Sequence, residues 1–316
     1  AFTPRLHTSL FTPPPFGAML RRKLSGASRR ALSTAIRPRR SALYLPGSNA
    51  RALEKAKSLA CDVLLLDCED AVAPENKELA RDQIAGALRA GGYGRRELVV
   101  RTNSLDTPWG VADLRAAAAA GADAVLLPKV EDVSMVQRAF AALEGAPTAI
   151  WVMVETPLGV LRAESLAASP LVGCLVAGTN DLAADLRCDG AWAERAALLP
   201  SLAQMVLAAR AHGKVALDGV HIDLADDAGL AASCDQGRRL GFDGKSLIHP
   251  KTIAAANAAF TPSADEVARA RAVIAAFDAA AAAGSALAVL DGKLVEELHV
   301  RASRRLIAVA EACAES

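Results

Sequence analysis

The chain has 316 residues, of which 52% are hydrophobic but only 4% aromatic, and its formal net charge is +1. This length suits one large α/β domain or two small ones, with a core built from aliphatic side chains. No run approaches the roughly eighteen consecutive apolar residues of a membrane span, and the charge excludes a generally basic surface. We therefore expect neither a membrane nor a nucleic acid as a partner.

The first forty residues differ in composition from the rest of the chain. Residues 1–40 hold nine basic residues and no acidic one, and they are rich in Ser, Thr and Pro. Such a composition is typical of an organellar transit peptide. We predict a transit peptide or disordered leader over 1–40 and a mitochondrial location, with plastid or cytoplasm as alternatives. Removing these nine from the 36 basic residues leaves 27 against 35 acidic ones, so the remainder is mildly acidic.

Short apolar runs recur from residue 41 onward and predict eight strands. The runs lie at 41–46, 61–67, 97–103, 122–129, 149–155, 171–178, 214–220 and 243–249. Segments with helical spacing separate them, for example 49–60 and 75–90. Continuous apolar runs are typical of parallel strands that are covered on both faces.

Eight such strands alternating with helices predict a (β/α)8 TIM barrel over 41–282, with a C-terminal helical extension or lid at 283–316. A doubly wound open sheet is the alternative. Neither a GxGxxG motif after a strand nor a Walker-type loop supports that alternative.

The six cysteines show neither a CxxC motif nor a paired Cys/His spacing. Cys61, Cys68 and Cys174 lie within or beside apolar runs. We predict reduced, buried thiols rather than a disulfide framework or a zinc site.

Polar side chains follow the predicted strands at the ends where a barrel of this kind carries its chemistry. These residues are Asp67, Glu69, Asp70, Arg101, Asn103, Lys129, Glu155, Asp181, Asp218 and His249. A single carboxylate after a strand is often the N-cap of the next helix. Acids and an arginine recurring at the same end of many strands instead predict a functional site.

Glu155 and Asp181 are the best candidates for metal ligands. Two carboxylates from neighbouring strands, completed by water and substrate oxygens, commonly bind Mg²⁺. No His or Cys lies beside them in the sequence, which disfavours zinc. Arg101 would supply a fixed cation for a substrate carboxylate or a developing oxyanion. The pattern points to a small oxoacid or its enolate.

Several motifs resemble, in order over about 41–280, the citrate lyase beta-subunit-like family, relatives of malyl-CoA and citramalyl-CoA lyases. The motifs are ALYLPGSNARALEKA, LLLDCEDAVAPENK, VVRTNS, LLPKVE, VMVETPLG, GTNDL and GFDGKSLIHPKTIAAANAAFTPS. The resemblance implies a (β/α)8 barrel, a homotrimer, Mg²⁺ and acyl-CoA substrates.

The resemblance also assigns roles to the residues at the strand ends. It implies that Glu155 and Asp181 bind the metal, and that Arg101 binds the substrate. Glu69 and Asp70 look like outer-shell acids that hold metal-bound water.

Further residues are similar to those of the family that act on CoA and on protons. Tyr44, Arg51 and Lys55 fall where the family binds CoA, although exposed helix charges explain the last two equally well. Asp291 resembles a C-terminal acid or base that reaches the neighbouring subunit. The glycine that usually precedes that aspartate is missing here, with Leu287 near its place, so a simple turn in "DG" is the alternative.

The resemblance implies a Mg²⁺-dependent carbon–carbon lyase acting on a 3-hydroxyacyl-CoA, such as malyl-CoA or citramalyl-CoA, to give acetyl-CoA and a small oxoacid. Two alternatives stay open: a 2-keto-3-deoxy sugar-acid aldolase, and a citryl-thioester lyase subunit inactive on free CoA esters. Asp70 stands where the sugar-acid aldolases typically have His, which disfavours the first alternative. The oxoacid, whether glyoxylate, pyruvate or oxaloacetate, is open because loop shape decides it.

Overall fold

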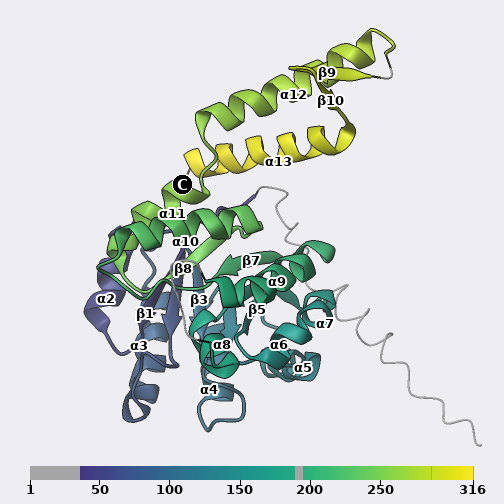
Figure 1. Cartoon of the computed structure of the whole chain (residues 1–316). Coiled ribbons are helices and arrows are strands. Elements are labelled where there is room, and N and C mark those ends of the chain that lie inside the picture. Colours follow the sequence, from purple (N-terminus) through teal and green to yellow (C-terminus); the bar gives the residue numbers. More distant parts are fainter. Residues whose placement is uncertain (1–35, 189–194, 286, 316) are drawn as a thin grey trace, which may run out of the picture. The chain divides into compact units, whose positions relative to one another are not determined.

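Eight parallel strands form a closed barrel in the computed structural model, which describes residues 36–188, 195–285 and 287–315 (Figure 1). They pair in chain order, and β1 closes the ring on β8, with Ala42 beside both Val63 and Ser246. The predicted (β/α)8 barrel is confirmed. The strands are β1 Ser41–Pro46, β2 Val63–Asp67, β3 Glu97–Arg101, β4 Ala124–Leu127, β5 Ala149–Val154, β6 Val172–Ala177, β7 Val215–Asp218 and β8 Gly244–Leu247.

Helices follow the strands and cover the outside of the barrel. The α-helices around the barrel are α2 Ala50–Lys55, α3 Lys77–Ala90, α4 Gly110–Ala119, α5 Val133–Ala142, α6 Pro157–Leu161, α7 Ala163–Ala168, α8 Thr179–Leu186, α9 Leu199–Ala211, α10 Asp227–Leu240 and α11 Ile253–Phe260. Short 3-10 helices are η1 Ala56–Ser58, η2 Pro74–Asn76, η3 Ala196–Leu198 and η4 Pro250–Thr252. None of the helices in the described residues has the length and hydrophobicity that crossing a membrane requires.

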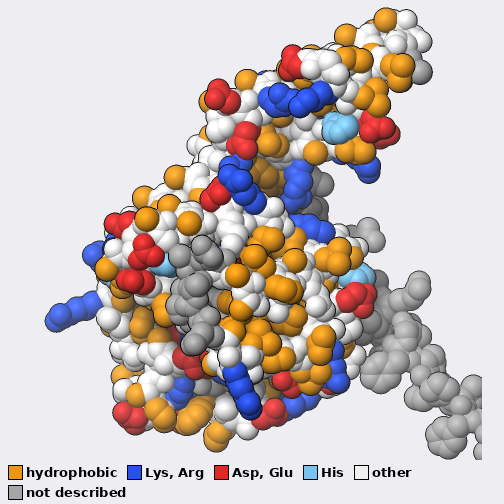
Figure 2. Space-filling view, viewed as in Figure 1, with side chains coloured by type: hydrophobic (Ala, Val, Ile, Leu, Met, Phe, Trp, Pro, Cys, Tyr) orange, Lys and Arg blue, Asp and Glu red, His pale blue; other side chains and the backbone are white. Residues whose placement is uncertain are grey.

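The C-terminal part consists of two long helices and a hairpin. Helix α12 (Ala264–Ala282) begins at a capping box in which Ser263 and Glu266 bond each other's backbone. It packs against α13 (Glu297–Ala314) and against the hairpin of β9 (Ala288–Leu290) and β10 (Lys293–Val295). Figure 2 shows charged side chains of both signs on this part. Helix α12 therefore packs with the C-terminal extension, although the predicted barrel extends to residue 282.

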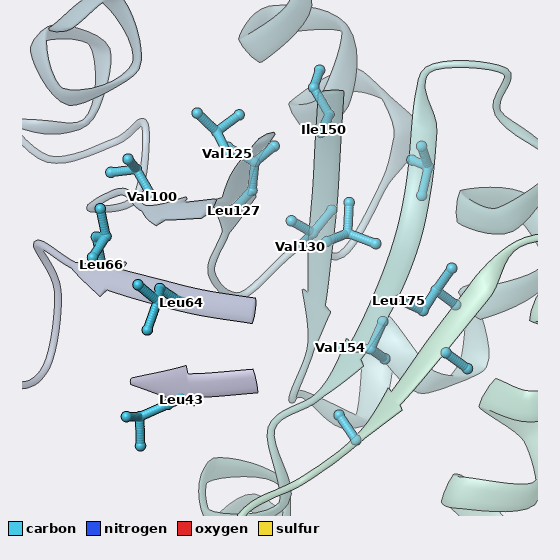
Figure 3. Packing of buried hydrophobic residues seen from close by; sticks show 14 of the residues in the cluster. Leu43, Leu64, Leu66, Val100, Val125, Leu127, Val130, Ile150, Val154 and Leu175 are labelled. Atoms are coloured by element: carbon cyan, nitrogen blue, oxygen red, sulfur yellow. The ribbon is translucent and has the colours of Figure 1, made fainter. Parts of the chain in front are cut away.

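Apolar side chains fill both faces of the barrel wall. Outward-facing residues such as Leu64, Val125 and Leu175 pack beneath the helices (Figure 3). Inward-facing residues such as Leu65 and Trp151 form a second cluster inside the barrel. Continuous apolar strands are thus explained, because each strand is buried on both sides. All six cysteines are free thiols, as predicted.

Residues just before β1 close the amino-terminal end of the barrel. Arg39 bonds Glu97 at the start of β3 and lies 5.4 Å from the centre of the Trp151 ring. Arg40 forms a two-pronged ion pair with Asp62, with both nitrogen–oxygen distances at 2.8 Å. The folded unit therefore begins upstream of residue 41, whereas the rest of the predicted leader, residues 1–35, lies outside the described residues.

Candidate active site

The site lies at the carboxyl ends of the barrel strands. Inward and outward residues alternate along each strand, and the inward series of β2, β3 and β5 end in Asp67, Arg101 and Glu155. All three are buried. Asp181 joins them from the first turn of α8, directly after β6. The fold thus brings together the acids and the arginine that the sequence predicted at one rim.

Arg101 is held rigidly by a neighbouring strand. Its Nε and Nη2 donate to the two carboxylate oxygens of Asp67 at 2.7 and 2.6 Å. Its guanidinium carbon lies 4.7 Å from the centre of the Tyr44 ring. Burial acts to lower the pKa of Arg101, but the hydrogen bonds and charge of Asp67 outweigh it and raise that pKa. Arg101 is therefore a fixed cation.

Glu69 and Asp70 stand on the loop after β2, in front of this arginine. Nη1 of Arg101 lies 2.8 Å from Glu69 Oε2 and 3.3 Å from Asp70 Oδ2. The contact to Glu69 Oε2 is not aligned as a hydrogen bond, so within the described residues this buried oxygen accepts none. Lys77 fixes the loop by donating to the backbone carbonyls of Cys68 and Glu69.

Lys129, at the end of β4, connects the acids of the rim. Its Nζ lies 3.2 Å from Glu69 Oε1 and 3.2 Å from Asp181 Oδ2. Its backbone N–H donates to Glu155 Oε1 at 2.7 Å. The residue has a φ of 49°, a left-handed conformation that non-glycine residues seldom adopt. One residue thus contacts three of the acids.

Glu155 is the most perturbed acid of the rim. Burial, with the nearby charge of Glu69, raises its pKa to about 8. Gly178, the next inward position of β6, leaves room for this side chain, since a β-carbon there would collide with Glu155. Burial and the neighbouring acids therefore outweigh the effect of Lys129 on this carboxylate.

These residues fit a magnesium ion that water and substrate help to coordinate. In the part of the chain that the structure describes, no three His, Cys, Asp or Glu side chains converge as a complete metal site. Glu155 and Asp181 nevertheless both lie close enough to Lys129 to raise its pKa, although its partial burial acts to lower it. The ammonium group of Lys129 already lies among these acids, so the position suits a cation. Glu69 Oε2, which accepts no hydrogen bond from a described residue, suits contact with metal-bound water.

Three of the strand-end residues do not belong to the site. Asp218 faces outward, where it binds the buried Lys245 and Arg195 at 3.0 and 2.7 Å. Asn103 donates to Asp113 of α4. His249 is exposed and caps η4. Their expected place at the functional rim was wrong, because Asp218 joins β7 to β8, Asn103 binds the first turn of α4 and His249 caps η4.

The residues predicted to act on CoA and on protons lie in different places. Tyr44 is inside the barrel beneath Arg101. Arg51 and Lys55 are exposed on α2 and make no ion pair with any described residue. Asp291 is the exposed first residue of the β9–β10 turn, with Gly292 after it, and its Oδ2 lies 3.8 Å from Arg269 of α12. Within this chain Asp291 makes no contact with the rim acids.

The contacts of Asp67, Lys77 and Lys129 in the site were not predicted from the sequence. Each of these residues was visible only as a charged residue near a strand end or helix start. Asp67 lies on the same inward face as Leu65, which the structure shows but the sequence does not.

A family model described as HpcH/HpaI aldolase/citrate lyase matches residues 40–250. The chain belongs to this family. The resemblance seen in the motifs is confirmed, and the chain is an enzyme of the carbon–carbon lyase type, as the sequence predicted.

Named relatives cover nearly the whole chain. A "(3S)-malyl-CoA thioesterase" of Cereibacter sphaeroides is 47% identical over 88% of this chain and 96% of its own length. An "L-malyl-CoA/beta-methylmalyl-CoA lyase" of the same species is 36% identical over 87% and 95%. The citrate lyase subunit beta of Escherichia coli is 35% identical over 87% and 94%.

Solved structures of relatives share the barrel. CitE of Mycobacterium tuberculosis, in complex with magnesium, acetoacetate and coenzyme A, has a TM-score of 0.71 and 29% identity over 86% of this chain and 97% of its own. The citrate lyase beta subunit of that organism, complexed with oxaloacetate and magnesium, has a TM-score of 0.62 and 32% identity over 72% and 98%.

Proposed function

We propose that this chain is a Mg²⁺-dependent lyase that breaks a carbon–carbon bond of a 3-hydroxyacyl-CoA, such as malyl-CoA or citramalyl-CoA, to give acetyl-CoA and a small oxoacid. The observation that carries the proposal is the convergence of Glu155 and Asp181 on Lys129 at one rim, where Glu69 contacts both Lys129 and Arg101. The relative named malyl-CoA/methylmalyl-CoA lyase supports the substrate class. The magnesium complexes of related structures support the metal.

Each acid of the rim has a distinct part in this proposal. Glu155 and Asp181 would hold Mg²⁺, and Glu69 and Asp70 would bind its water molecules. Bound Mg²⁺ supplies Lewis-acid polarisation of the hydroxyl and carboxylate at the substrate's malyl end. Arg101, which Asp67 fixes, places positive charge where the enolate of the acetyl thioester develops.

In the proposed cleavage, the substrate loses one proton from its hydroxyl group and gains one at the enolate carbon. The substrate hydroxyl gives up its proton to solvent water, the adjacent carbon–carbon bond breaks, and its electron pair becomes the enolate of acetyl-CoA. The former hydroxyl carbon becomes the carbonyl of the oxoacid. A proton then returns to the enolate carbon, and we assign this step to Asp291 of a neighbouring copy. The exposure of Asp291 on its turn supports this assignment.

Two exposed cations support binding of the CoA portion. Arg51 and Lys55 are four residues apart on α2, so they lie on one side of the helix that follows β1. Phosphates of CoA would pair with both. The coenzyme A complex of the related CitE is consistent with this part of the proposal.

Exposed apolar side chains support the proposed homo-oligomer. Val289 and Leu294 pair across the β9–β10 hairpin and are 59% and 50% exposed. Hydrophobic side chains also gather over the face that α7 and α9 present in Figure 2. Among the residues of α9, Leu207 is 71% exposed. Association of copies would bury such side chains. We propose a homotrimer, which light scattering during gel filtration would test.

A second function, hydrolysis of the thioester of malyl-CoA, is favoured by the 47% identity to a protein named malyl-CoA thioesterase. The two reactions differ in products. Hydrolysis releases malate and CoA with a free thiol, whereas the lyase reaction releases glyoxylate and acetyl-CoA without one. Assaying free thiol and oxoacid in parallel on (3S)-malyl-CoA separates them.

A substrate panel tests the proposal against the remaining alternatives. Malyl-CoA, citramalyl-CoA, citryl-CoA and free 2-keto-3-deoxy sugar acids would each be assayed with and without Mg²⁺. The proposal expects Mg²⁺-dependent acetyl-CoA from at least one of the first two. Turnover restricted to free keto acids would indicate an aldolase, and no turnover of any free CoA ester would indicate a citryl-thioester lyase subunit.

A further inference from the structure

The ammonium group of Lys129 lies among the rim acids, next to the position at which the proposed metal ion would bind. Its ammonium nitrogen lies 3.2 Å from one oxygen of Glu69 and 3.2 Å from one oxygen of Asp181. The first is an outer-shell acid and the second a metal ligand in the proposed function. The side chain is 45% exposed, so it has room to move away.

The backbone of Lys129 is held independently of its side chain. Its N–H donates to Glu155 Oε1 at 2.7 Å, and its φ of 49° sets the direction of that bond. The side chain can therefore leave Asp181 while the backbone keeps its bond to Glu155. The backbone of Lys129 therefore has a structural role, through its bond to Glu155, that does not depend on the charge of its side chain.

The charges around the rim define the role of the Lys129 ammonium group. The acids that face it are Glu69, Asp70, Glu155 and Asp181. Among the described residues, Arg101 is the other cation beside this group, and two of its nitrogens are bound to Asp67. Without a divalent ion, Lys129 is the charge that holds Glu69 and Asp181 together.

A divalent ion on Glu155 and Asp181 would stand next to this ammonium. Like charges a few ångströms apart in a partly buried site repel strongly. The carboxylates that Lys129 contacts, Glu69 and Asp181, would also be needed by the ion or its water. The two cations therefore compete for the same acids.

We infer that Lys129 is a built-in competitor of the metal: its ammonium binds Glu69 and Asp181 in the metal-free protein and leaves them when a divalent ion binds. This inference rests on the proposed Mg²⁺ site. It explains how several acids remain close together before the metal arrives. It also means that the lysine lowers the affinity of the empty site for metal.

Binding of Mn²⁺, followed by electron paramagnetic resonance on the metal-free full chain without substrate, tests the inference. The variants are Lys129→Asn, which removes the charge with a residue that tolerates a left-handed backbone, and Lys129→Arg, which keeps the charge. Lys214→Asn makes the same change of charge just before β7, at the opposite end of the strands, and serves as the matched control.

Two partly exposed ion pairs each contribute a factor of up to about five, so Lys129→Asn should tighten Mn²⁺ binding about tenfold. Lys129→Arg and Lys214→Asn should bind like the parent protein. In EDTA, Lys129→Asn should also melt at a lower temperature than the parent and gain more from added Mn²⁺. If Lys129→Asn fails to fold, Lys129→Gly provides the same test with a backbone that favours positive φ.

Equal or weaker Mn²⁺ binding by Lys129→Asn, with clear binding by the parent, would overturn the inference and leave the metal site standing. Absence of Mn²⁺ binding in both the parent and Lys129→Asn would remove the metal site itself and the inference with it. Tighter binding by Lys214→Asn as well would show a general charge effect and would also overturn it.

Discussion

Arg101 and Asp67 lie side by side in the register of β3 and β2 and share two parallel hydrogen bonds in the barrel interior. This pair fixes the plane of the guanidinium, so that its third nitrogen faces Glu69 and Asp70. The direction of the cation is thus set by strand pairing rather than by a flexible loop. A buried two-pronged pair of this kind is stronger and more directional than a lysine contact.

Replacing Arg101 by Lys should lower kcat by about 10²-fold, because an ammonium cannot make both bonds to Asp67 and still face the substrate. The loss is expected without a change in circular dichroism. Steady-state rates on the preferred CoA ester give the measurement. Near-normal turnover by Arg101→Lys would show that the two-pronged geometry is unimportant.

Gly178→Ala should displace the side chain of Glu155, since the added methyl group would collide with it. We expect at least about tenfold weaker Mn²⁺ binding, as is found for perturbed support of a metal ligand. Gly173→Ala on the same strand is the control, because its methyl group would meet no atom closer than 3.7 Å. The idea fails if the two variants bind Mn²⁺ equally well.

The pH dependence of the metal-free protein should report on Glu155. Its pKa of about 8 means that a metal must displace a proton at neutral pH, so Mn²⁺ affinity should rise about tenfold per pH unit up to about pH 8. Its folded pKa lies above the unfolded value, so its contribution to stability is present at low pH and disappears as pH rises through 8. Urea titrations of metal-free protein should therefore show lower stability at pH 9 than at pH 6.

The Glu155→Gln variant provides the control for this dependence. Without the ionisable group, the loss of stability between pH 6 and pH 9 should shrink. An unchanged pH profile in Glu155→Gln would assign the dependence to another group.

Asp218→Asn should unfold more easily but remain active when folded. The change leaves Lys245 and Arg195 buried without their carboxylate, which costs about 3–5 kcal/mol. Asp235→Asn, which removes an exposed pair with Arg239 on α10, should cost under about 1 kcal/mol. Urea unfolding and activity per folded molecule give the comparison. Lost activity with full stability would place Asp218 in the site after all.

The strands and the rim could be predicted because both follow from patterns along the chain. Apolar runs located all eight barrel strands to within a few residues, and charged residues at their ends located Arg101 and Glu155. The direction in which a residue faces was not predictable. Strands buried on both faces show no apolar–polar alternation, so nothing in the sequence told the outward Asp218 from the inward Asp67.

Contacts between residues that are far apart in the chain could not be predicted from the sequence either. Arg39 reads as part of a basic leader, yet its partner Glu97 lies at the start of β3. Lys129 reads as an ordinary strand end, and its side-chain contacts come from the loop after β2 and from the first turn of α8. Such pairs depend on closure of the barrel, which joins elements that are far apart in the chain.

The proposed function requires that Glu155 and Asp181 hold the metal ion on which cleavage of the carbon–carbon bond depends. The most direct measurement follows acetyl-CoA and glyoxylate from (3S)-malyl-CoA for the parent, Glu155→Gln and Asp181→Asn, with Mg²⁺ and with EDTA. We expect equal amounts of both products from the parent with Mg²⁺, and rates at least about 10²-fold lower in EDTA and in both variants. Full turnover in EDTA, or in either variant, would contradict the proposed function.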